Sequence, residues 1–305
     1  MKKIYIFALL FSLFIFTIVI IASIEKDTSN SFWREIGSWF KRKTRIKKQI
    51  DLSNNNGKKI SPKLKNMEAA KKQKLHPVKC KKCVYMIVIL DDAGLLKKTY
   101  GLLKYKRPLN FSILPGQFFT TFWKRKINKR RIHEIMIHIP MAAYDYPKSG
   151  IRPGMNADYI RKYLKKLTEK FPEAKGANNH QGSLATSNHF LMKKFFKVYK
   201  NTGLYFVDSI TSNRTAAYYY AKKNNVKALR RNYFIDNRKS TSYIYRQLKI
   251  AVKYAKRKGH VVVIGHTTSR NLIKALHAME KIFVKYKVRF ITVSNFLKLQ
   301  KKEKN

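Results

Sequence analysis

Acidic residues are scarce in this chain of 305 residues: 16 Asp and Glu stand against 67 Lys and Arg, a formal net charge of +51. Such an excess attracts a protein to anions, including phospholipid headgroups, nucleic acids and acidic glycans. A compositional habit of the source explains it equally well. Residues 25–83 hold 18 basic and 5 acidic residues, and residues 84–305 hold 47 and 11. This spread excludes a neutral domain with one basic arm, and it makes each cluster of acids conspicuous.

Cysteine is equally scarce, with Cys80 and Cys83 as the two in the chain. Two cysteines exclude a disulfide framework. A lone C-x-x-C pair is at most half of a zinc site or a redox dithiol, and we favour a local disulfide or two idle thiols. The hydrophobic share of 45% and the aromatic share of 13% exclude disorder throughout, because they are sufficient for a sizeable core.

One long uncharged run stands near the N-terminus. Ile4–Ile24 holds no charge over 21 positions, and as a helix it reaches about 30 Å, the thickness of one hydrocarbon core. We interpret residues 1–24 as an uncleaved signal anchor, with a cleaved signal peptide as the alternative. Lys2 and Lys3 favour a cytoplasmic N-terminus. We therefore expect a single-pass protein of the cytoplasmic (inner) membrane, with its globular domain on the extracytoplasmic, periplasmic side.

Residues 25–83 are predicted to be a basic, largely unstructured linker, because turn residues are frequent and apolar periodicity is weak. The basic run Lys41–Lys48 opposes the predicted orientation, but long domains translocate largely regardless of such charges. We expect this run either to lie on anionic lipid or to be a solvated part of the linker.

From Val84 onward the chain alternates between strand-like runs and amphipathic helical segments. The predicted strands are Val84–Leu90, Leu109–Leu114, Glu134–Ile139, Ala174–Asn178, Leu204–Val207, Val226–Leu229, His260–Ile264 and Val288–Val293. The predicted helices include Asn156–Phe171, Ser187–Tyr199, Thr241–Lys258 and Ser269–Tyr286, with Asn156 and Ser187 as N-caps and Gly203 and Gly259 as C-terminal stops. Seven or eight strands that alternate with helices predict an α/β fold with a parallel sheet, open or closed. The length of residues 84–305 suits one barrel-like domain.

Ionisable and amide residues follow six of the apolar runs. They are Asp91-Asp92, His138, the stretch Asn178-Asn179-His180 with Ser183 shortly after it, Asp208, Asp236 after the further run Arg231–Ile235, and His266. Chemistry in parallel α/β folds gathers at the carboxyl ends of the strands. Four of the eleven acids in the domain fall at these ends, which marks them as a candidate site.

These residue types suit metal-assisted hydrolysis. Asp92 with two histidines forms a two-His, one-carboxylate set that suits Zn²⁺ with an open position for water. Asp91 is then the candidate base that takes a proton from that water. His266 is the candidate acid that delivers a proton to a leaving amine.

Each candidate also has a structural alternative. Asp91 and Asp92 are able to cap the following turn, and His138 and His266 are able to be core histidines. Asp208 and Asp236 are either hydrogen-bond partners behind the site or turn residues. Asn178, Asn179 and Ser183 are candidates for supporting the site or contacting substrate.

Six short motifs stand in order at these strand ends. They are LDDAG (Leu90–Gly94), HEIMIHIPM (His133–Met141), GANNHQGS (Gly176–Ser183), FVDS (Phe206–Ser209), IDN (Ile235–Asn237) and VIGH (Val263–His266). Together they resemble the divergent polysaccharide deacetylase family, part of the wider carbohydrate esterase superfamily of polysaccharide deacetylases. The resemblance covers about Val84 to Leu297, and it implies an irregular (β/α) barrel of seven to eight mostly parallel strands with a divalent metal, usually zinc.

The same resemblance implies roles by position. Asp91 resembles the family's catalytic base, Asp92 its metal-binding aspartate, His138 its first metal histidine and His266 its general acid. In the wider superfamily a second metal histidine follows four residues after the first, where this chain has Ala142. The divergent family's Asn-Asn-His-x-Gly-Ser motif supports His180 as the replacement.

Three positions depart from the family pattern. Gln181 stands where Met is usual, Ala142 where Glu is frequent, and Thr267 where Pro usually follows the histidine. None of them removes a proposed ligand, so they bear on the substrate subsite rather than on the metal.

The resemblance implies a membrane-anchored, extracytoplasmic, metal-dependent hydrolase that deacetylates N-acetylated sugars of a cell-wall or envelope polysaccharide. The alternative is a catalytically weak or inactive module that binds a glycan or a partner on the same fold. We expect no nucleic acid partner despite the charge, because zinc-finger, helix-turn-helix and RNA-recognition signatures are absent from the sequence.

Overall fold

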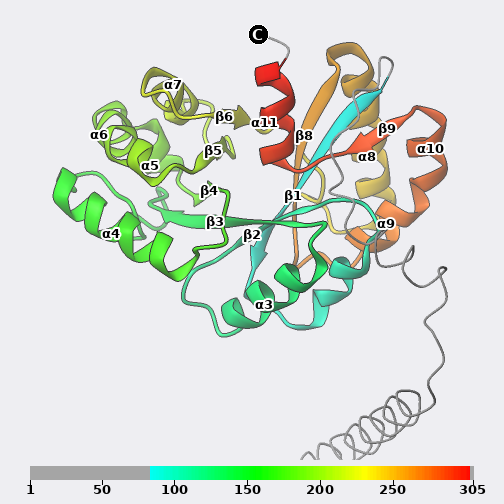
Figure 1. Cartoon of the computed structure of the whole chain (residues 1–305), viewed down its shortest axis with the longest axis horizontal. Helices are drawn as coiled ribbons and strands as arrows, with labels where there is room; N and C mark the ends of the chain where they lie inside the picture. Colours follow the sequence, from blue (N-terminus) through cyan, green and yellow to red (C-terminus); the bar gives the residue numbers. More distant parts are fainter. Residues whose placement is uncertain (1–82, 303–305) are drawn as a thin grey trace, which may run out of the picture. The chain divides into compact units, whose positions relative to one another are not determined.

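The computed structural model of this protein describes residues 83–302 (Figure 1). The predicted signal anchor, Cys80 and nearly all of the predicted linker lie outside these residues. Within residues 83–302, no helix combines the length and the apolar character needed to cross a bilayer.

Nine strands of the described part form one sheet in which every pairing between strands is parallel (Figure 1). Their bounds are β1 (Val84–Ala93), β2 (Asn110–Ile113), β3 (Glu134–Met141), β4 (Gly176–Gln181), β5 (Tyr205–Asp208), β6 (Ala228–Arg230), β7 (Tyr233–Phe234), β8 (His260–His266) and β9 (Val288–Phe290). The strand order is β6-β5-β4-β3-β2-β1-β8-β7, and β9 pairs with β1. The sheet curls into a half-barrel that stays open, because no pairing in the described part joins β6 to β7.

The predicted α/β class and its parallel strands are confirmed. Each of the eight predicted strands overlaps an observed one, and the ninth, β7, lies within the run Arg231–Ile235. Strand β7 has only two residues, which is too short to show a period of two in the sequence. The predicted count of seven to eight strands is therefore one fewer than the nine observed. Of the predicted alternatives the sheet is the open one, a curled half-barrel that is consistent with an irregular (β/α) barrel.

Helices follow most of the strands. They are η1 (Lys98–Lys104), α3 (Thr120–Arg130), α4 (Ala157–Lys170), α5 (Ser183–Ser187), α6 (His189–Tyr199), η2 (Lys200–Thr202), α7 (Ala217–Lys223), α8 (Thr241–Lys258), α9 (Leu272–Ala278), α10 (Glu280–Lys285) and α11 (Val293–Lys302). Asn156 caps α4 as predicted, because its side chain accepts a hydrogen bond from the Tyr159 N–H. Gly259, at φ +80°, ends α8 as predicted.

The predicted N-cap at Ser187 is wrong. Asn188 caps α6 instead, accepting a 2.8 Å hydrogen bond from the Leu191 N–H. Ser187 is the last residue of α5, and its hydroxyl donates to the Ser183 carbonyl at 2.7 Å. Both residue types are good caps, so the sequence alone did not separate two adjacent candidates.

The sheet is covered on both faces. The outer face packs against the surrounding helices in the larger apolar cluster. The inner face of the half-barrel holds a smaller cluster, to which α11 contributes Val293 and Phe296. Strand β1 shows the alternation clearly, because Met86, Val88 and Leu90 belong to the outer cluster whereas Ile87 and Ile89 belong to the inner one. Alternate residues along a strand of this sheet therefore face the interior of the half-barrel.

Candidate functional site

The period of two along the strands directs several candidate residues into the half-barrel. The inner-facing series are Ile87, Ile89 and Asp91 on β1, Met136 and His138 on β3, and Val262, Ile264 and His266 on β8. Between the ends of each strand these positions are apolar, and an ionisable residue stands at the carboxyl end; Glu134 and His260, the first residues of β3 and β8, share the same parity. Register places Asp91 opposite His266 and His138 opposite Asn178, so four predicted residues meet at one end of the sheet.

Asp92 reaches the same side by leaving the strand conformation. Its φ is +61°, in the left-handed region that a residue other than glycine seldom adopts. Strict alternation would send the side chain after Asp91 to the outer face. The turn instead brings Asp92 Oδ1 to 3.5 Å from His138 Nε2 and 3.3 Å from His180 Nδ1. Both adjacent carboxylates therefore face the site.

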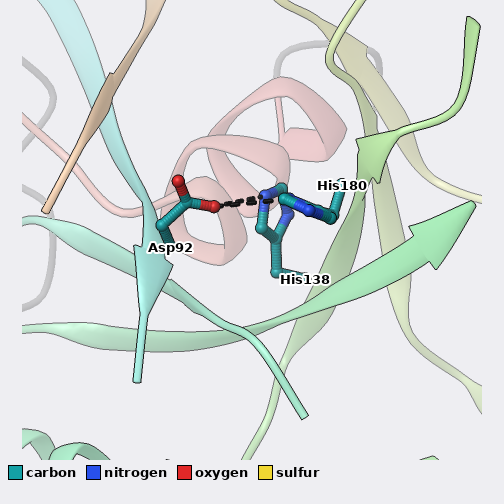
Figure 2. A group of neighbouring side chains, drawn as sticks. All are labelled: Asp92, His138 and His180. Carbon is teal, nitrogen blue, oxygen red and sulfur yellow. Dashed lines mark ion pairs between the residues drawn. The ribbon is translucent and has the colours of Figure 1, made fainter. Parts of the chain in front are cut away.

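Asp92, His138 and His180 form the group that could hold a metal ion (Figure 2). One ligand atom from each lies within 4.8 Å of the others, and the two imidazole rings stand nearly perpendicular with centroids 4.8 Å apart. Asp92 Oδ1 is buried and has no hydrogen-bond partner. An orphaned buried carboxylate oxygen is costly unless something satisfies it. Two nitrogens and one oxygen fit a divalent cation with an open position.

Charge is unevenly distributed within this group. Burial raises the pKa of Asp92, but the neighbouring rings of His138 and His180 outweigh it and hold that pKa well below its usual range. Burial lowers the pKa of His138, and the carboxylates of Asp91 and Asp92 reverse that effect, so the net shift is upward. The site therefore keeps one carboxylate ionised beside two imidazoles.

Asn178 connects the candidate base to the candidate ligand. It is fully buried, and its Oδ1 accepts a 2.9 Å hydrogen bond from His138 Nδ1 and another from the Ser112 hydroxyl. Its Nδ2 donates to Asp91 Oδ1 at 2.9 Å and to Ser209 Oγ at 3.1 Å. Because Asn178 Oδ1 only accepts, His138 Nδ1 carries a proton, which leaves the lone pair of neutral His138 on Nε2, the atom nearest Asp92.

His266 is paired with Asp236. Its Nδ1 lies 2.9 Å from Asp236 Oδ1, and its backbone N–H donates to Asp236 Oδ2 at 2.7 Å. Burial lowers the pKa of His266, but Asp236, Asp91 and Asp92 together raise it to about 9. At neutral pH this imidazole therefore carries a proton that it can donate.

Asp91 is almost completely buried, with 2% of its surface exposed. Burial raises its pKa, and the nearby charges of His138 and His266 oppose that effect without cancelling it. A carboxylate with a raised pKa is a stronger base than an exposed one. Its backbone carbonyl also accepts a 2.8 Å hydrogen bond from the Thr267 N–H, which ties the base to the turn after His266.

Three of the predicted supporting residues stabilise loops rather than contact the group. Asp208 is fully buried and accepts hydrogen bonds from the Ile210 and Tyr218 N–H groups and the Thr215 hydroxyl. Asn179 accepts from the Ser209 N–H and donates to the Gln181 carbonyl. Ser183 accepts from the Tyr144 N–H at 3.2 Å. The turn-residue alternative describes Asp208, whereas Asp236 contacts His266 directly.

Sequence reasoning missed three residues around the site. Ser112 and Ser209 both bond to Asn178, and Arg231 donates to the Ser209 carbonyl at 2.6 Å with its guanidinium 3.8 Å from the centre of the Phe234 ring. A serine inside the apolar run of β2 was a usable signal. Arg231 offered none, because cations are frequent throughout this chain.

Comparison with known proteins gives the same family that the sequence motifs resemble. A family model described as divergent polysaccharide deacetylase matches residues 88–297. The uncharacterized protein YibQ of Escherichia coli (strain K12) is 36% identical over 185 residues, which cover 59% of this chain and 58% of that protein. This chain thus spans less than two thirds of that relative. An uncharacterized protein of Haemophilus influenzae (strain ATCC 51907 / DSM 11121 / KW20 / Rd) is 29% identical over 197 residues, 63% of this chain and 70% of that protein.

A similar fold occurs in a solved structure. The crystal structure of the uncharacterized protein ATU2773 from Agrobacterium tumefaciens C58 gives a TM-score of 0.65, at 17% identity. The match covers 72% of this chain and 92% of that one. At this identity the likeness shows the fold alone.

The metal assignment predicts which side chains control metal binding. Asp92→Ala and His180→Ala should each lower the zinc retained after dialysis by about tenfold or more, because each removes one of three protein ligands. Metal content per chain, measured by mass spectrometry, checks this. Asp145→Ala, at an exposed acid, is the matched control and should retain the wild-type content. Unchanged metal in Asp92→Ala and His180→Ala would show that the ligands lie elsewhere.

Proposed function

The chain belongs to the divergent polysaccharide deacetylase family, and on this premise we propose that it hydrolyses the acetamide of N-acetylated sugars in a polysaccharide. The observation that carries the proposal is the meeting of Asp91, the Asp92–His138–His180 group and His266 at one end of the sheet. A buried base, a candidate metal group and a protonated imidazole are three parts that metal-assisted amide hydrolysis uses.

A divalent metal held by Asp92, His138 and His180, zinc by the chemistry of these donors, would polarise the acetamide carbonyl and acidify water. Asp91 accepts the proton of the attacking water on its buried carboxylate. A hydrogen bond from Asn178 Nδ2 to Asp91 Oδ1 holds that carboxylate in place. His266 donates its proton to the departing amine. Asp236 supports that step, because it orients the His266 ring through Nδ1 and stabilises the imidazolium.

We also propose a place of action. The uncharged run Ile4–Ile24 after Lys2 and Lys3 supports a single-pass anchor in the cytoplasmic membrane, with the domain on the extracytoplasmic side. Cell-wall or envelope polysaccharide is the substrate available there, and the family to which the chain belongs supports a polysaccharide substrate.

Acetate release tests the proposed reaction. Purified zinc-loaded protein should release acetate from chitin or peptidoglycan oligomers, and Asp91→Asn and His266→Ala should each lower the rate by about 10²–10⁴-fold, because each removes a proton-transfer group. The exposed Asp145→Asn is the control and should keep the wild-type rate. Saturable binding of the oligomers with no acetate release would contradict hydrolysis and favour a binding module.

The pH dependence tests the role of His266. Because its pKa is raised to about 9, activity that needs its protonated form should persist through neutral pH and fall as the pH rises through about 9. Asp236→Asn removes the carboxylate, so the pKa of His266 should fall and the alkaline limb should move by about one pH unit or more toward neutral. Profiles of kcat/KM for both proteins measure this shift. An unmoved alkaline limb in Asp236→Asn would exclude His266 as the titrating acid.

A further inference from the structure

A cavity lies away from the candidate site, at the seam between β6 and β7 where the half-barrel stays open. It has a volume of about 520 Å³ and is lined by residues of α7, β6, β8 and α11 and by residues beside these elements. Figure 1 shows α11 between β6 and β8. Leu229 and Val262 of the inner apolar cluster, together with Leu297, form apolar parts of the lining. A cavity of this volume is in the range of small-molecule sites.

Four cationic side chains line this cavity: Lys222, Lys227, Arg230 and Lys301. They come from separate places in the chain, namely α7, the residue before β6, β6 itself and α11. None of the lining residues is an acid, and no ion pair in residues 83–302 includes any of the four. All four are exposed at the cavity, and an anion bound there would relieve the repulsion among these like charges.

One acid, Asp208, lies behind the cavity, and the charge of Arg230 acts to lower the pKa of its carboxyl. Asp208 of β5 is in register with Arg230 of β6. Its carboxylate is fully buried and already accepts hydrogen bonds from Thr215 and from two backbone N–H groups. The guanidinium of Arg230 instead lies over the ring of Tyr218, 5.5 Å from its centroid, and Tyr218 also lines the cavity. This stacking orients the guanidinium at the cavity wall.

The cavity is separate from the catalytic end of the sheet. Its lining includes His260, the first residue of β8, whereas His266 of the candidate site is the last. Six strand steps place these two residues about 20 Å apart. None of the four cations has a hydrogen bond or ion pair with the candidate site among the contacts of residues 83–302.

We propose that this seam cavity binds an organic phosphate. A phosphate group carries up to two negative charges and several acceptor oxygens, which suits three lysines and an arginine better than a single carboxylate does. The cavity is larger than a phosphate alone, and the Tyr218 ring with Leu229, Val262 and Leu297 offers apolar surface to the organic part of the ligand. A sugar phosphate and the headgroup of an anionic phospholipid share this chemistry.

Calorimetric titration of the full chain in detergent tests the proposal. Glucose 6-phosphate represents the soluble source, dihexanoyl phosphatidylglycerol represents the lipid source, and glucose is the neutral control. At least one phosphate probe should bind saturably with one site per chain, and glucose should not bind. The probe that binds more tightly identifies the source of the phosphate.

Matched variants separate this cavity from the general basicity of the chain. Lys227→Gln/Arg230→Gln and Lys222→Gln/Lys301→Gln should each weaken binding by about tenfold or more, since each removes two of the four cations. Lys253→Gln/Arg257→Gln removes the same charge from exposed positions on α8 and should change the affinity by less than about twofold. Lys222→Gln/Lys301→Gln leaves Arg230, the residue in register with Asp208, unchanged. If the substitution at Arg230 impairs folding, this variant still measures the contribution of the cavity cations.

Two results would overturn the proposal: absence of saturable binding by both phosphate probes, or equal weakening in the cavity variants and in the α8 variant. Acetate release should be the same in all three double variants, because none of the substituted residues belongs to the Asp92–His138–His180 group or is Asp91 or His266. The proposed hydrolysis and the proposed phosphate site can therefore be contradicted independently of each other.

Discussion

The buried amide of Asn178 is the interaction on which the arrangement of the site depends. Its oxygen accepts from Ser112 on β2 and from His138 on β3, while its nitrogen donates to Asp91 on β1 and to Ser209 after β5. A carboxamide is a neutral side chain that offers two donor hydrogens and an acceptor oxygen with two lone pairs in one plane. The same group therefore fixes the proton on His138 and positions the carboxylate of Asp91. Replacing it would leave several buried polar groups without partners, and each of those groups costs about 1–3 kcal/mol.

The inner face of the half-barrel explains why chemistry gathers at one end. Along β1, β3 and β8 the middle inward positions are apolar, and Asp91, His138 and His266 follow them toward the carboxyl end. An apolar cluster that includes Phe296 of α11 lines the inner face next to them. The ionisable residues are therefore held against a rigid apolar layer, where burial strengthens their mutual electrostatic effects. The positive φ of Asp92 adds a second carboxylate to that face.

Much of this arrangement could be predicted because it follows from local periodicity. The parallel strands, the caps at Asn156 and Gly259, and the proximity of Asp91 to His138 all follow from which residues end an apolar run. Other features depend on long-range contacts and left no local signal. The open seam beside β7 and the role of Arg231 are of this kind. The predicted anchor and linker fall outside the described residues and stay predictions.

The few acids are distributed differently in the candidate site and in the seam cavity. At the carboxyl ends of the strands, Asp91, Asp92 and Asp236 are each placed against a histidine. At the seam, four cations share one cavity that no acid lines. The large positive charge is thus general, whereas three of the 16 acids meet where the proposed chemistry occurs.

Anomalous X-ray diffraction from zinc-soaked crystals tests the central claim most directly. The account predicts one strong zinc peak bound by Asp92 Oδ1, His138 Nε2 and His180 Nδ1, with Asp91 beside the metal and still bonded to Asn178. A peak bound by Asp91 in place of Asp92, or zinc bound only at other residues, would contradict it.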